Sequence, residues 1–401
     1  MAPGHFAFDR NCAWLCRTDC ECDQEVVGDS GQPPEIGPDC DFDRVPDSIS
    51  KGQTMDKVRL GIIGAGRIGR VHAQTISNRS TLAVAAAITD INRGAAEELA
   101  RACGIPRVTS DAEEIFSDAS LNAVLICSST DSHSDLIVRA ARAGKHIFCE
   151  KPIDYDLARI DRALESVRNA RVKLQVGFNR RFDPNFARVR KAIESGEIGK
   201  PRLMHIVSRD PSPPPVSYIK TSGGMFFDMT IHDFDMARFL VQDEVEEVYA
   251  AAAVMVDPEI GKAGDVDTAI ITLRFKSGVI ATIDNCRQAA YGYDQRVELL
   301  GSKGSISTGN WYPNEAVIST GTEIRRDLPL NFFMERYAES FALELQSFIE
   351  AVAKDKPTEV TGMDARVPVL LGMAARQSVQ EGRPIKVQEV AALAPKVVGG
   401  S

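Results

Sequence analysis

A glycine-rich turn that joins an apolar strand to a helix constrains the fold of this chain more than any other feature. Residues 58–63 (Val-Arg-Leu-Gly-Ile-Ile) have the apolar content of a short buried strand, and 64–69 (Gly-Ala-Gly-Arg-Ile-Gly) follow at once. In this pattern the first glycine allows a tight turn, the second lets a pyrophosphate approach the backbone, and the third lets the helix pack closely on the strand. The free N–H groups at the start of the helix then face the anion. We therefore predict a dinucleotide-binding loop that includes Gly64, Gly66, Arg67, Ile68 and Gly69.

An acidic residue follows the second predicted strand, which spans 82–89. Asp90 comes 21 residues after Gly69, where a carboxylate accepts hydrogen bonds from the ribose hydroxyls of the adenosine half. The same charge repels a 2′-phosphate, so the pattern favours NAD over NADP. The nearby Arg93 tempers this preference without reversing it. The alternative is a purely structural glycine turn, with Asp90 as a solvated loop acid.

Strands and helices continue to alternate after this turn. Residues 123–127, 145–149 and 174–178 are apolar strand candidates, and helical segments separate them. The alternation predicts an α/β fold, with a Rossmann domain over 56–178 built on a doubly wound parallel sheet. Ligands of such sheets bind beyond the carboxyl ends of the strands. The further predicted cofactor contacts are Ser128, Thr130, His133, Glu150 and Lys151.

The second half of the chain has a different pattern. Strand candidates separated by short turns lie at 203–208, 245–256, 267–275, 279–286 and 295–300. Two helices, near 334–353 and 363–380, follow them. This order predicts a C-terminal α+β domain over 179–395 with a large, mostly antiparallel sheet. We assign substrate binding and oligomerisation to this domain.

The first 55 residues differ from the rest of the chain. They hold eleven acidic and four basic residues and show no strand or helix periodicity, so we predict a disordered acidic extension over 1–55. The same stretch holds five of the nine cysteines. Their spacing, Cys-x3-Cys-x3-Cys-x-Cys, leaves zinc binding as an alternative, but it matches no common zinc pattern, and we predict no metal site. Met55 directly precedes the first predicted strand, so a natural chain that begins at Met55 is a further alternative.

Charge and hydropathy argue against several classes of function. The net charge of −9 disfavours a nucleic-acid partner, which requires a basic face. The longest apolar run, 248–256, is about half of the roughly 18 residues that a membrane helix needs. The N-terminus also lacks the basic and apolar parts of a secretory signal. The four cysteines beyond residue 55 are isolated in apolar segments, as expected for packing thiols of a cytoplasmic protein.

Asp228 and His232 are the clearest candidates for acid–base chemistry. Residues four apart lie on one face of a helix, and a carboxylate beside an imidazole orients the ring and raises its basicity. Such a pair suits a general base that removes a proton from an alcohol. The alternative is that Asp228 caps the helix and His232 is a buried histidine with satisfied hydrogen bonds.

Basic residues follow two of the predicted strands. Lys151 lies between Glu150 and Pro152 at a strand end, where a lysine can hydrogen-bond a substrate hydroxyl and stabilise the alkoxide as it forms. The alternative is a solvated surface lysine. Arg180 and Arg181 follow the next strand and could clamp a polyol or a phosphate, and we expect one of the two to be surface charge.

Taken in order, these motifs resemble those of the Gfo/Idh/MocA oxidoreductases. The resemblance extends from about Lys57 to Pro384. Its most specific elements are residues 64–69, Glu150-Lys151-Pro152, 177–183 and 223–238. The segment 291–294 (Tyr-Gly-Tyr-Asp) resembles part of the family's substrate wall.

The resemblance implies a role for each of these elements. The family's catalytic group maps onto Lys151, Asp228 and His232. The implied substrate contacts are Arg181, Asp210, Asp228, His232, Tyr291 and Tyr293. The resemblance further implies a cis peptide bond between Lys151 and Pro152 and a homotetramer assembled through the antiparallel sheet.

The activity that the resemblance implies is the oxidation of a secondary hydroxyl of a cyclic polyol by NAD. The expected substrate is myo-inositol and the expected product is 2-keto-myo-inositol. A family dehydrogenase for scyllo-inositol or an aldose stays open as an alternative, as does a non-catalytic NAD-binding sensor on the same fold. The sensor is disfavoured because Lys151, Asp228 and His232 are all present.

Overall fold

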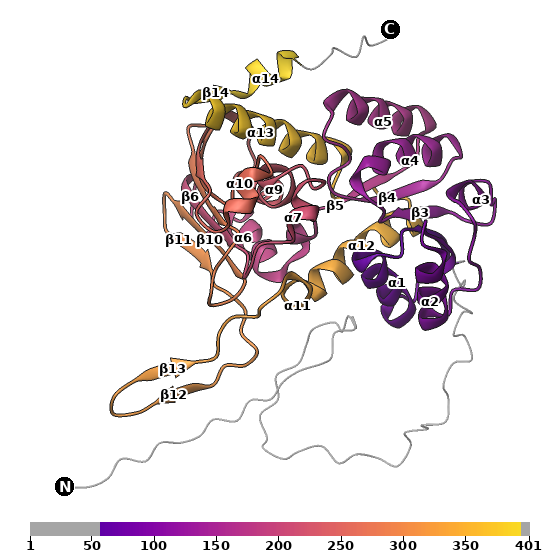
Figure 1. Cartoon of the computed structure of the whole chain (residues 1–401), viewed down its shortest axis with the longest axis horizontal. Coiled ribbons are helices and arrows are strands. Elements are labelled where there is room, and N and C mark those ends of the chain that lie inside the picture. Colours follow the sequence, from indigo (N-terminus) through magenta and orange to yellow (C-terminus); the bar gives the residue numbers. More distant parts are fainter. Residues whose placement is uncertain (1–56, 394–401) are drawn as a thin grey trace, which may run out of the picture. The chain divides into compact units, whose positions relative to one another are not determined.

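The computed structural model describes residues 57–393 (Figure 1). The predicted acidic extension over 1–55, with its cysteines and the alternative zinc site, lies outside these residues. Within 57–393, no helix is long and apolar enough to cross a lipid bilayer.

A five-stranded parallel sheet forms the first half of the described chain, as predicted. In spatial order its strands are β2 (Ala83–Thr89), β1 (Val58–Ile63), β3 (Ala123–Ile126), β4 (His146–Glu150) and β5 (Leu174–Gly177). The connecting helices are α1 (Arg67–Arg79), α2 (Arg93–Cys103), α3 (Ala112–Phe116), α4 (Thr130–Arg142) and α5 (Leu157–Ala170). Every residue of β3 is buried because helices cover both faces of the sheet, which explains its uninterrupted apolar sequence.

A helix from the far end of the chain completes one face of this sheet. In α12 (Ala338–Ala353), Leu345 and Phe348 are fully buried in one apolar cluster with Phe148 of β4 and with residues of α1 and α2. The C-terminal segment therefore supplies part of the core beneath the dinucleotide-binding half. One side chain of α12, Phe341, also lines the cavity at the carboxyl ends of the parallel strands.

A seven-stranded sheet dominates the second half. Its spatial order is β11 (Ser305–Thr308), β10 (Asp294–Gly301), β6 (Pro201–Arg209), β9 (Ile280–Cys286), β8 (Thr268–Phe275), β7 (Val245–Ala253) and β14 (Ile385–Lys386). Only the β6–β9 pair is parallel, so the prediction of a mostly antiparallel sheet is confirmed. The helices of this half are α6 (Pro184–Glu194), α9 (Thr230–Val241), α10 (Pro258–Lys262), α13 (Gly362–Glu381) and α14 (Val387–Leu393).

Short elements connect the two sheets and carry much of the site. They are η1 (Asn179–Phe182), α7 (Val216–Ile219), α8 (Met225–Asp228) and α11 (Phe333–Arg336). The strands β12 (Val317–Ser319) and β13 (Ile324–Arg326) form a hairpin that extends away from the rest of the described chain (Figure 1). The helix predicted near 334–353 is split at Tyr337, whose φ and ψ of −113° and 17° leave the helical region.

Candidate active site

A cavity of about 1140 Å³ opens at the carboxyl ends of the parallel strands. One wall consists of residues that follow β1, β3, β4 and β5, among them Arg67, Ser128, Lys151 and Asn179. The opposite wall comes from the second half and includes the proline-rich segment 210–215, His232, Arg287 and Tyr293. The lining of the cavity therefore includes both the glycine-rich loop and the predicted catalytic residues.

The glycine-rich loop has the features that a dinucleotide requires. Gly64 adopts a φ of +110°, which side chains rarely allow, and a Cβ on Gly69 would lie 2.0 Å from the Gly64 carbonyl oxygen. No heavy atom lies within 4 Å of the place where a Cβ on Gly66 would be, so a ligand can approach the backbone there. The first N–H groups of α1 have no partner within the helix and point toward this space.

Asp90 ties the end of β2 to the glycine-rich loop. Its Oδ2 accepts a hydrogen bond from the Ala65 N–H at 2.6 Å, and its Oδ1 accepts one from the Asn92 N–H at 2.7 Å. This is the place where a carboxylate meets an adenosine ribose in Rossmann domains. Arg93 donates to Glu97 at 2.9 Å, so its charge is already partly neutralised, which fits NAD better than NADP.

Three predicted cofactor contacts follow β3 and line the cavity: Ser128, Thr130 and His133. The Oγ atoms of Ser128 and Ser132 lie 2.7 Å apart. His133 is buried, and both its ring nitrogens lie within 3.0 Å of carbonyl oxygens, those of Pro152 and Ser128. It therefore holds two segments of the cavity wall together. The Lys151–Pro152 peptide bond is cis, as the resemblance implied.

Lys151 points from the end of β4 toward the second half of the chain. Its Nζ donates to the Asp228 carbonyl oxygen at 2.9 Å and lies 3.8 Å from the Asp228 Oδ1. Burial lowers the pKa of Lys151, and the neighbouring Asp228 opposes that shift. Lys151 is therefore a partly desolvated donor in the cavity, not a solvated surface lysine.

Asp228 and His232 both line the cavity, but they do not form the predicted pair. Helix α8 ends at Asp228 and α9 begins at Thr230, so one continuous helix does not carry both residues. The Asp228 carboxylate accepts from the Tyr218 hydroxyl at 2.9 Å and from Arg287 Nη1 at 3.3 Å. Within the described residues, the buried Nδ1 of His232 has no hydrogen-bond partner. The prediction that Asp228 orients His232 is corrected on this point.

His232 lies among apolar and cationic neighbours. Burial lowers the pKa of His232 well below its usual range, and the charges of Lys151 and Arg180 lower it further. The Phe178 ring meets it edge-on at 5.9 Å between centroids. The imidazole is therefore neutral at physiological pH and able to accept a proton.

The two adjacent arginines have different environments. Arg180 lines the cavity and donates to Asp233 at 2.6 Å. Arg181 lies outside the cavity lining, because Asp235 of α9 and Asp364 of α13 bind its guanidinium. The predicted contact between Arg181 and a polyol is therefore corrected, and Arg180 is the arginine that faces a ligand.

The two predicted tyrosines also have different environments. Tyr293 lines the cavity and is buried. The Tyr291 hydroxyl instead donates to Asp294 at 2.6 Å and accepts from Arg209 at 3.0 Å. Tyr291 therefore supports the loop that carries Tyr293, and its predicted role in the substrate wall is corrected.

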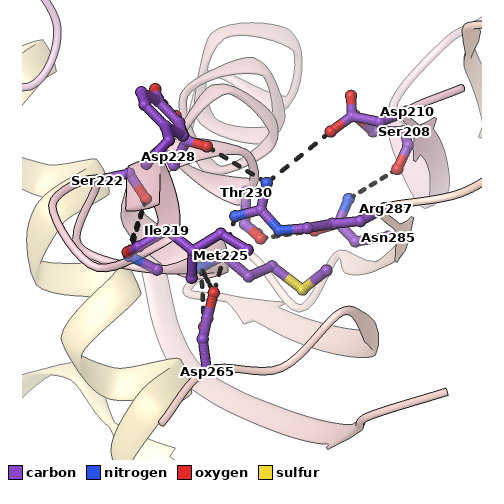
Figure 2. A network of polar contacts seen from close by, with 12 residues as sticks. Ser208, Asp210, Ile219, Ser222, Met225, Asp228, Thr230, Asp265, Asn285 and Arg287 are labelled. Atoms are coloured by element: carbon purple, nitrogen blue, oxygen red, sulfur yellow. Dashed lines mark hydrogen bonds and ion pairs between the residues drawn. The ribbon is translucent and has the colours of Figure 1, made fainter. Parts of the chain in front are cut away.

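Sequence reasoning missed Arg287, the centre of the polar network shown in Figure 2. Arg287 is 1% exposed, and its guanidinium nitrogens lie 3.3 Å from Asp228, 4.0 Å from Asp210 and 3.8 Å from Asp265. Asp265 in turn accepts from the Met225 N–H at 3.1 Å, at the start of α8. The sequence signal for Arg287 was its place directly after the predicted strand 279–286.

Asp210 lines the cavity beside this network, as predicted. Burial raises the pKa of Asp210 to about 6, with Asp228 adding to the shift and Arg287 opposing it. The carboxyl group thus changes its charge close to physiological pH. An ionised Asp210 offers two acceptor oxygens to ligand hydroxyls.

Comparison with known proteins connects this geometry to a family. A family model described as an oxidoreductase family with an NAD-binding Rossmann fold matches residues 58–178, and a GFO/IDH/MocA C-terminal domain model matches residues 186–307. The chain is 48% identical to the myo-inositol 2-dehydrogenase of Thermotoga maritima over 333 residues, which are 83% of this chain and 99% of that protein. It is 50% identical to the inositol 2-dehydrogenase of Rhizobium meliloti over 330 residues, 82% and 99% of the two chains.

Solved structures give the same result. The crystal structure of a probable dehydrogenase from Thermotoga maritima superimposes with a TM-score of 0.81 at 48% identity and covers 83% of this chain and 99% of its own. The scyllo-inositol dehydrogenase of Lactobacillus casei, solved with NAD(H) and scyllo-inositol, gives a TM-score of 0.78 at 28% identity, with 83% and 100% covered.

Proposed function

Because this chain belongs to the Gfo/Idh/MocA family of oxidoreductases and uses NAD, we propose that it oxidises a secondary hydroxyl of myo-inositol to give 2-keto-myo-inositol. The observation that carries this proposal is the convergence of Lys151, Asp228 and His232 on one cavity with the dinucleotide-binding loop. The similarity to enzymes named as inositol dehydrogenases supports the substrate class.

The character of the cavity wall also supports a polyol. Polar side chains approach the ligand space from both halves of the chain: Lys151, Asn179, Arg180, Asp210, Asp228, His232 and Tyr293. A ligand with a hydroxyl on every ring carbon satisfies such donors and acceptors. A ligand that lacks hydroxyls leaves buried polar groups unpaired, so the site rejects it strongly.

The neutral imidazole of His232 accepts the hydroxyl proton. The Nζ of Lys151 donates to the same oxygen and stabilises the negative charge that develops there. Asp228 holds Lys151 by charge and is itself held by Tyr218 and Arg287. NAD, when held by the glycine-rich loop, would supply the hydride acceptor for the ring carbon. The chain thus supplies binding, orientation and proton removal.

The experiment measures NAD reduction by absorbance with myo-inositol, scyllo-inositol, glucose and galactose, each also with NADP. We expect the highest kcat/KM with NAD and myo-inositol, and loss of turnover in His232→Ala. The bound scyllo-inositol of the Lactobacillus casei relative makes that epimer the second candidate. A higher kcat/KM with scyllo-inositol or an aldose contradicts the choice of myo-inositol. NAD binding without turnover on any of the four compounds favours the sensor.

We also propose that copies of this chain assemble into a homotetramer through the seven-stranded sheet. The side chains on its open face include large exposed apolar residues from five strands: Leu203, Tyr249, Ile270, Ile280 and Leu300. Leu203 of β6 pairs directly with Ile280 of β9 and with Leu300 of β10, so these three side chains form one apolar cluster, and exposed apolar side chains gathered in this way mark an interaction surface. Light scattering should give the mass of a tetramer, and Ile280→Glu should dissociate it. A monomeric wild-type protein contradicts this proposal.

A further inference from the structure

Three buried polar residues from distant segments meet behind the cofactor cavity. His72 lies on α1, Glu150 ends β4 and Glu344 lies on α12. One ligand-type atom from each of these side chains lies within 4.8 Å of the other two. His72 Nε2 is 2.8 Å from the Glu150 Oε1. His72 and Glu344 are fully buried, whereas the Glu150 side chain is 13% exposed and lines the cavity.

Glu344 is the unusual member of this cluster. Within 57–393, neither of its carboxyl oxygens has a hydrogen-bond partner. An ionised carboxylate without partners is strongly disfavoured in a protein interior. Burial raises the pKa of Glu344 well above its usual range, and the charge of Glu150 raises it further. Two carboxyl groups in one buried site hold a proton between them, because both cannot be ionised at once.

Glu150 is the member of the carboxyl pair that has a hydrogen-bond partner for a negative charge. Glu150 lines the cavity, its charge acts on the adjacent Lys151, and His72 Nε2 can donate to its carboxylate. The other titratable groups nearby are the thiols of Cys127 and Cys149, and burial raises the pKa of both well above the usual value, so they are neutral. The negative charge of the cluster therefore lies at the cavity wall.

The backbone around the cluster is adapted to this arrangement. A Cβ on Gly177 would lie 2.9 Å from the Glu150 Oε2, so the carboxylate occupies space that a side chain on β5 would take. Gln175, two residues earlier on the same face of β5, donates from Nε2 to the Glu344 carbonyl oxygen at 2.7 Å. This bond fixes the turn of α12 that carries Glu344 against the sheet.

We propose that Glu344 is a positioning residue that, as a neutral acid, donates its proton toward Glu150 and so holds the Glu150 carboxylate, ionised, at the wall of the cofactor cavity. The separation allows a direct bond after a small side-chain rotation or a bridge through one water molecule. The inference rests on NAD binding and is independent of which polyol is oxidised.

The arrangement favours one redox form of the cofactor. The oxidised nicotinamide ring is a cation and the reduced ring is neutral, so a fixed anion at the cavity wall stabilises the oxidised form more. Glu344 thereby adjusts the relative affinities for NAD⁺ and NADH without touching either. Removing the proton donor should allow Glu150 to take up a proton or to rotate away, and the preference should fall.

Three full-length variants test this inference. Glu344→Gln keeps an N–H donor and cannot ionise, and Glu344→Leu removes the donor at similar volume. Glu339→Gln is the matched control, because Glu339 lies on the exposed side of the same helix and pairs with Arg79. Dissociation constants for NAD⁺ and NADH come from calorimetry and NADH fluorescence, without any substrate. Infrared spectra in H₂O and D₂O report the carbonyl band of a protonated carboxylic acid.

At pH 8, where Asp210 is ionised, we expect the wild type to show the carboxylic-acid band and both Glu344 variants to lack it. The ratio of the NAD⁺ and NADH dissociation constants should stay near wild type in Glu344→Gln and Glu339→Gln. In Glu344→Leu it should rise about tenfold, because the oxidised nicotinamide ring loses the attraction of the fixed anion. A wild type without the band, or a folded Glu344→Leu variant with an unchanged ratio, overturns the inference. If Glu344→Leu does not fold, the inference is judged by the carboxylic-acid band of the wild type and by the ratio of the two dissociation constants in Glu344→Gln. A wild type that binds neither NAD⁺ nor NADH refutes the use of NAD instead.

Discussion

Arg287 and Asp228 form an ion pair at the cavity wall, with Nη1 of the arginine 3.3 Å from Oδ2 of the aspartate. The same guanidinium lies 3.8 Å from Asp265, which accepts from the N–H of Met225 at the start of α8. Arg287 therefore acts on both ends of this four-residue helix (Figure 2). This is why the Asp228 carboxylate points to Arg287 and Tyr218 and forms no hydrogen bond with His232.

Arg287→Met should destabilise the fold and impair turnover. It leaves the partly buried carboxylates around Arg287 without their cation, so the free energy of unfolding should fall by about 2 kcal/mol. Urea denaturation measures this change. Arg188→Met is the control, because Arg188 and Glu197 form an exposed pair, worth about 0–1 kcal/mol. Equal stability of Arg287→Met and Arg188→Met would contradict the clamping role of Arg287.

Lys151→Met should bind NAD and lose turnover. The variant keeps the volume and removes the cation that stabilises the developing alkoxide, so kcat should fall about 100-fold or more. Steady-state kinetics measure kcat, and NADH fluorescence measures cofactor binding. Wild-type turnover in this variant would show that Lys151 has no catalytic role.

Asp210 should make both stability and substrate binding depend on pH. Burial raises its pKa to about 6 from an ordinary value of 3.8. Between these two pH values the unfolded chain has lost the proton that the folded chain keeps, so this group's contribution to stability decreases as pH rises and is lowest above about pH 6. Asp210→Asn should therefore raise the urea midpoint more at pH 8 than at pH 4.

The same titration should affect the Michaelis constant. An ionised Asp210 accepts hydrogen bonds from substrate hydroxyls, so KM in the wild type should rise as pH falls below about 6. Asp210→Asn should have a raised KM that is flat across this range. A wild-type pH dependence that persists in Asp210→Asn would assign the titration to another group.

Arg181→Met should mainly lower stability, whereas Arg180→Met should mainly weaken substrate binding. Arg181 binds buried Asp235 and lies outside the cavity, so its loss should lower the free energy of unfolding by about 3 kcal/mol and leave KM within about twofold. Arg180 lines the cavity, so Arg180→Met should raise KM for the polyol. Denaturation and steady-state kinetics on both variants make the comparison. A large KM effect confined to Arg181→Met would restore the original prediction.

Asp90→Ala should weaken the preference for NAD. The change removes an acceptor for the ribose and the charge that repels a 2′-phosphate, and it also frees the Ala65 N–H. The KM for NAD should rise about tenfold, since a hydrogen bond to a charged group contributes about 1.5–3 kcal/mol. The KM for NADP should fall. Initial rates with each cofactor measure both constants, and an unchanged NAD/NADP ratio would contradict the role of Asp90.

The sequence alone determined the features that depend on near neighbours in the chain. The glycine-rich turn, the apolar run of β3 and the change to an antiparallel sheet follow from spacing and residue type, because backbone geometry and strand burial are local properties. The strand-end position of Lys151 is a local feature of the same kind. The resemblance added Asp210, Tyr293 and the cis bond before Pro152, and the structure places the side chains of Lys151, Asp210 and Tyr293 in the cavity.

Only the tertiary structure decided how the polar side chains pair. The spacing of Asp228 and His232 assumed one continuous helix, but α8 ends at Asp228. Its start is set by the positive-φ turn at Gly223 and Gly224 and by Asp265, which accepts from the Met225 N–H. Arg287 meets Asp228, and Glu344 approaches Glu150, across long stretches of chain. Whether a buried charge faces a ligand, an opposite charge or a shared proton depends on which distant segments pack beside it, and spacing along the chain does not specify that.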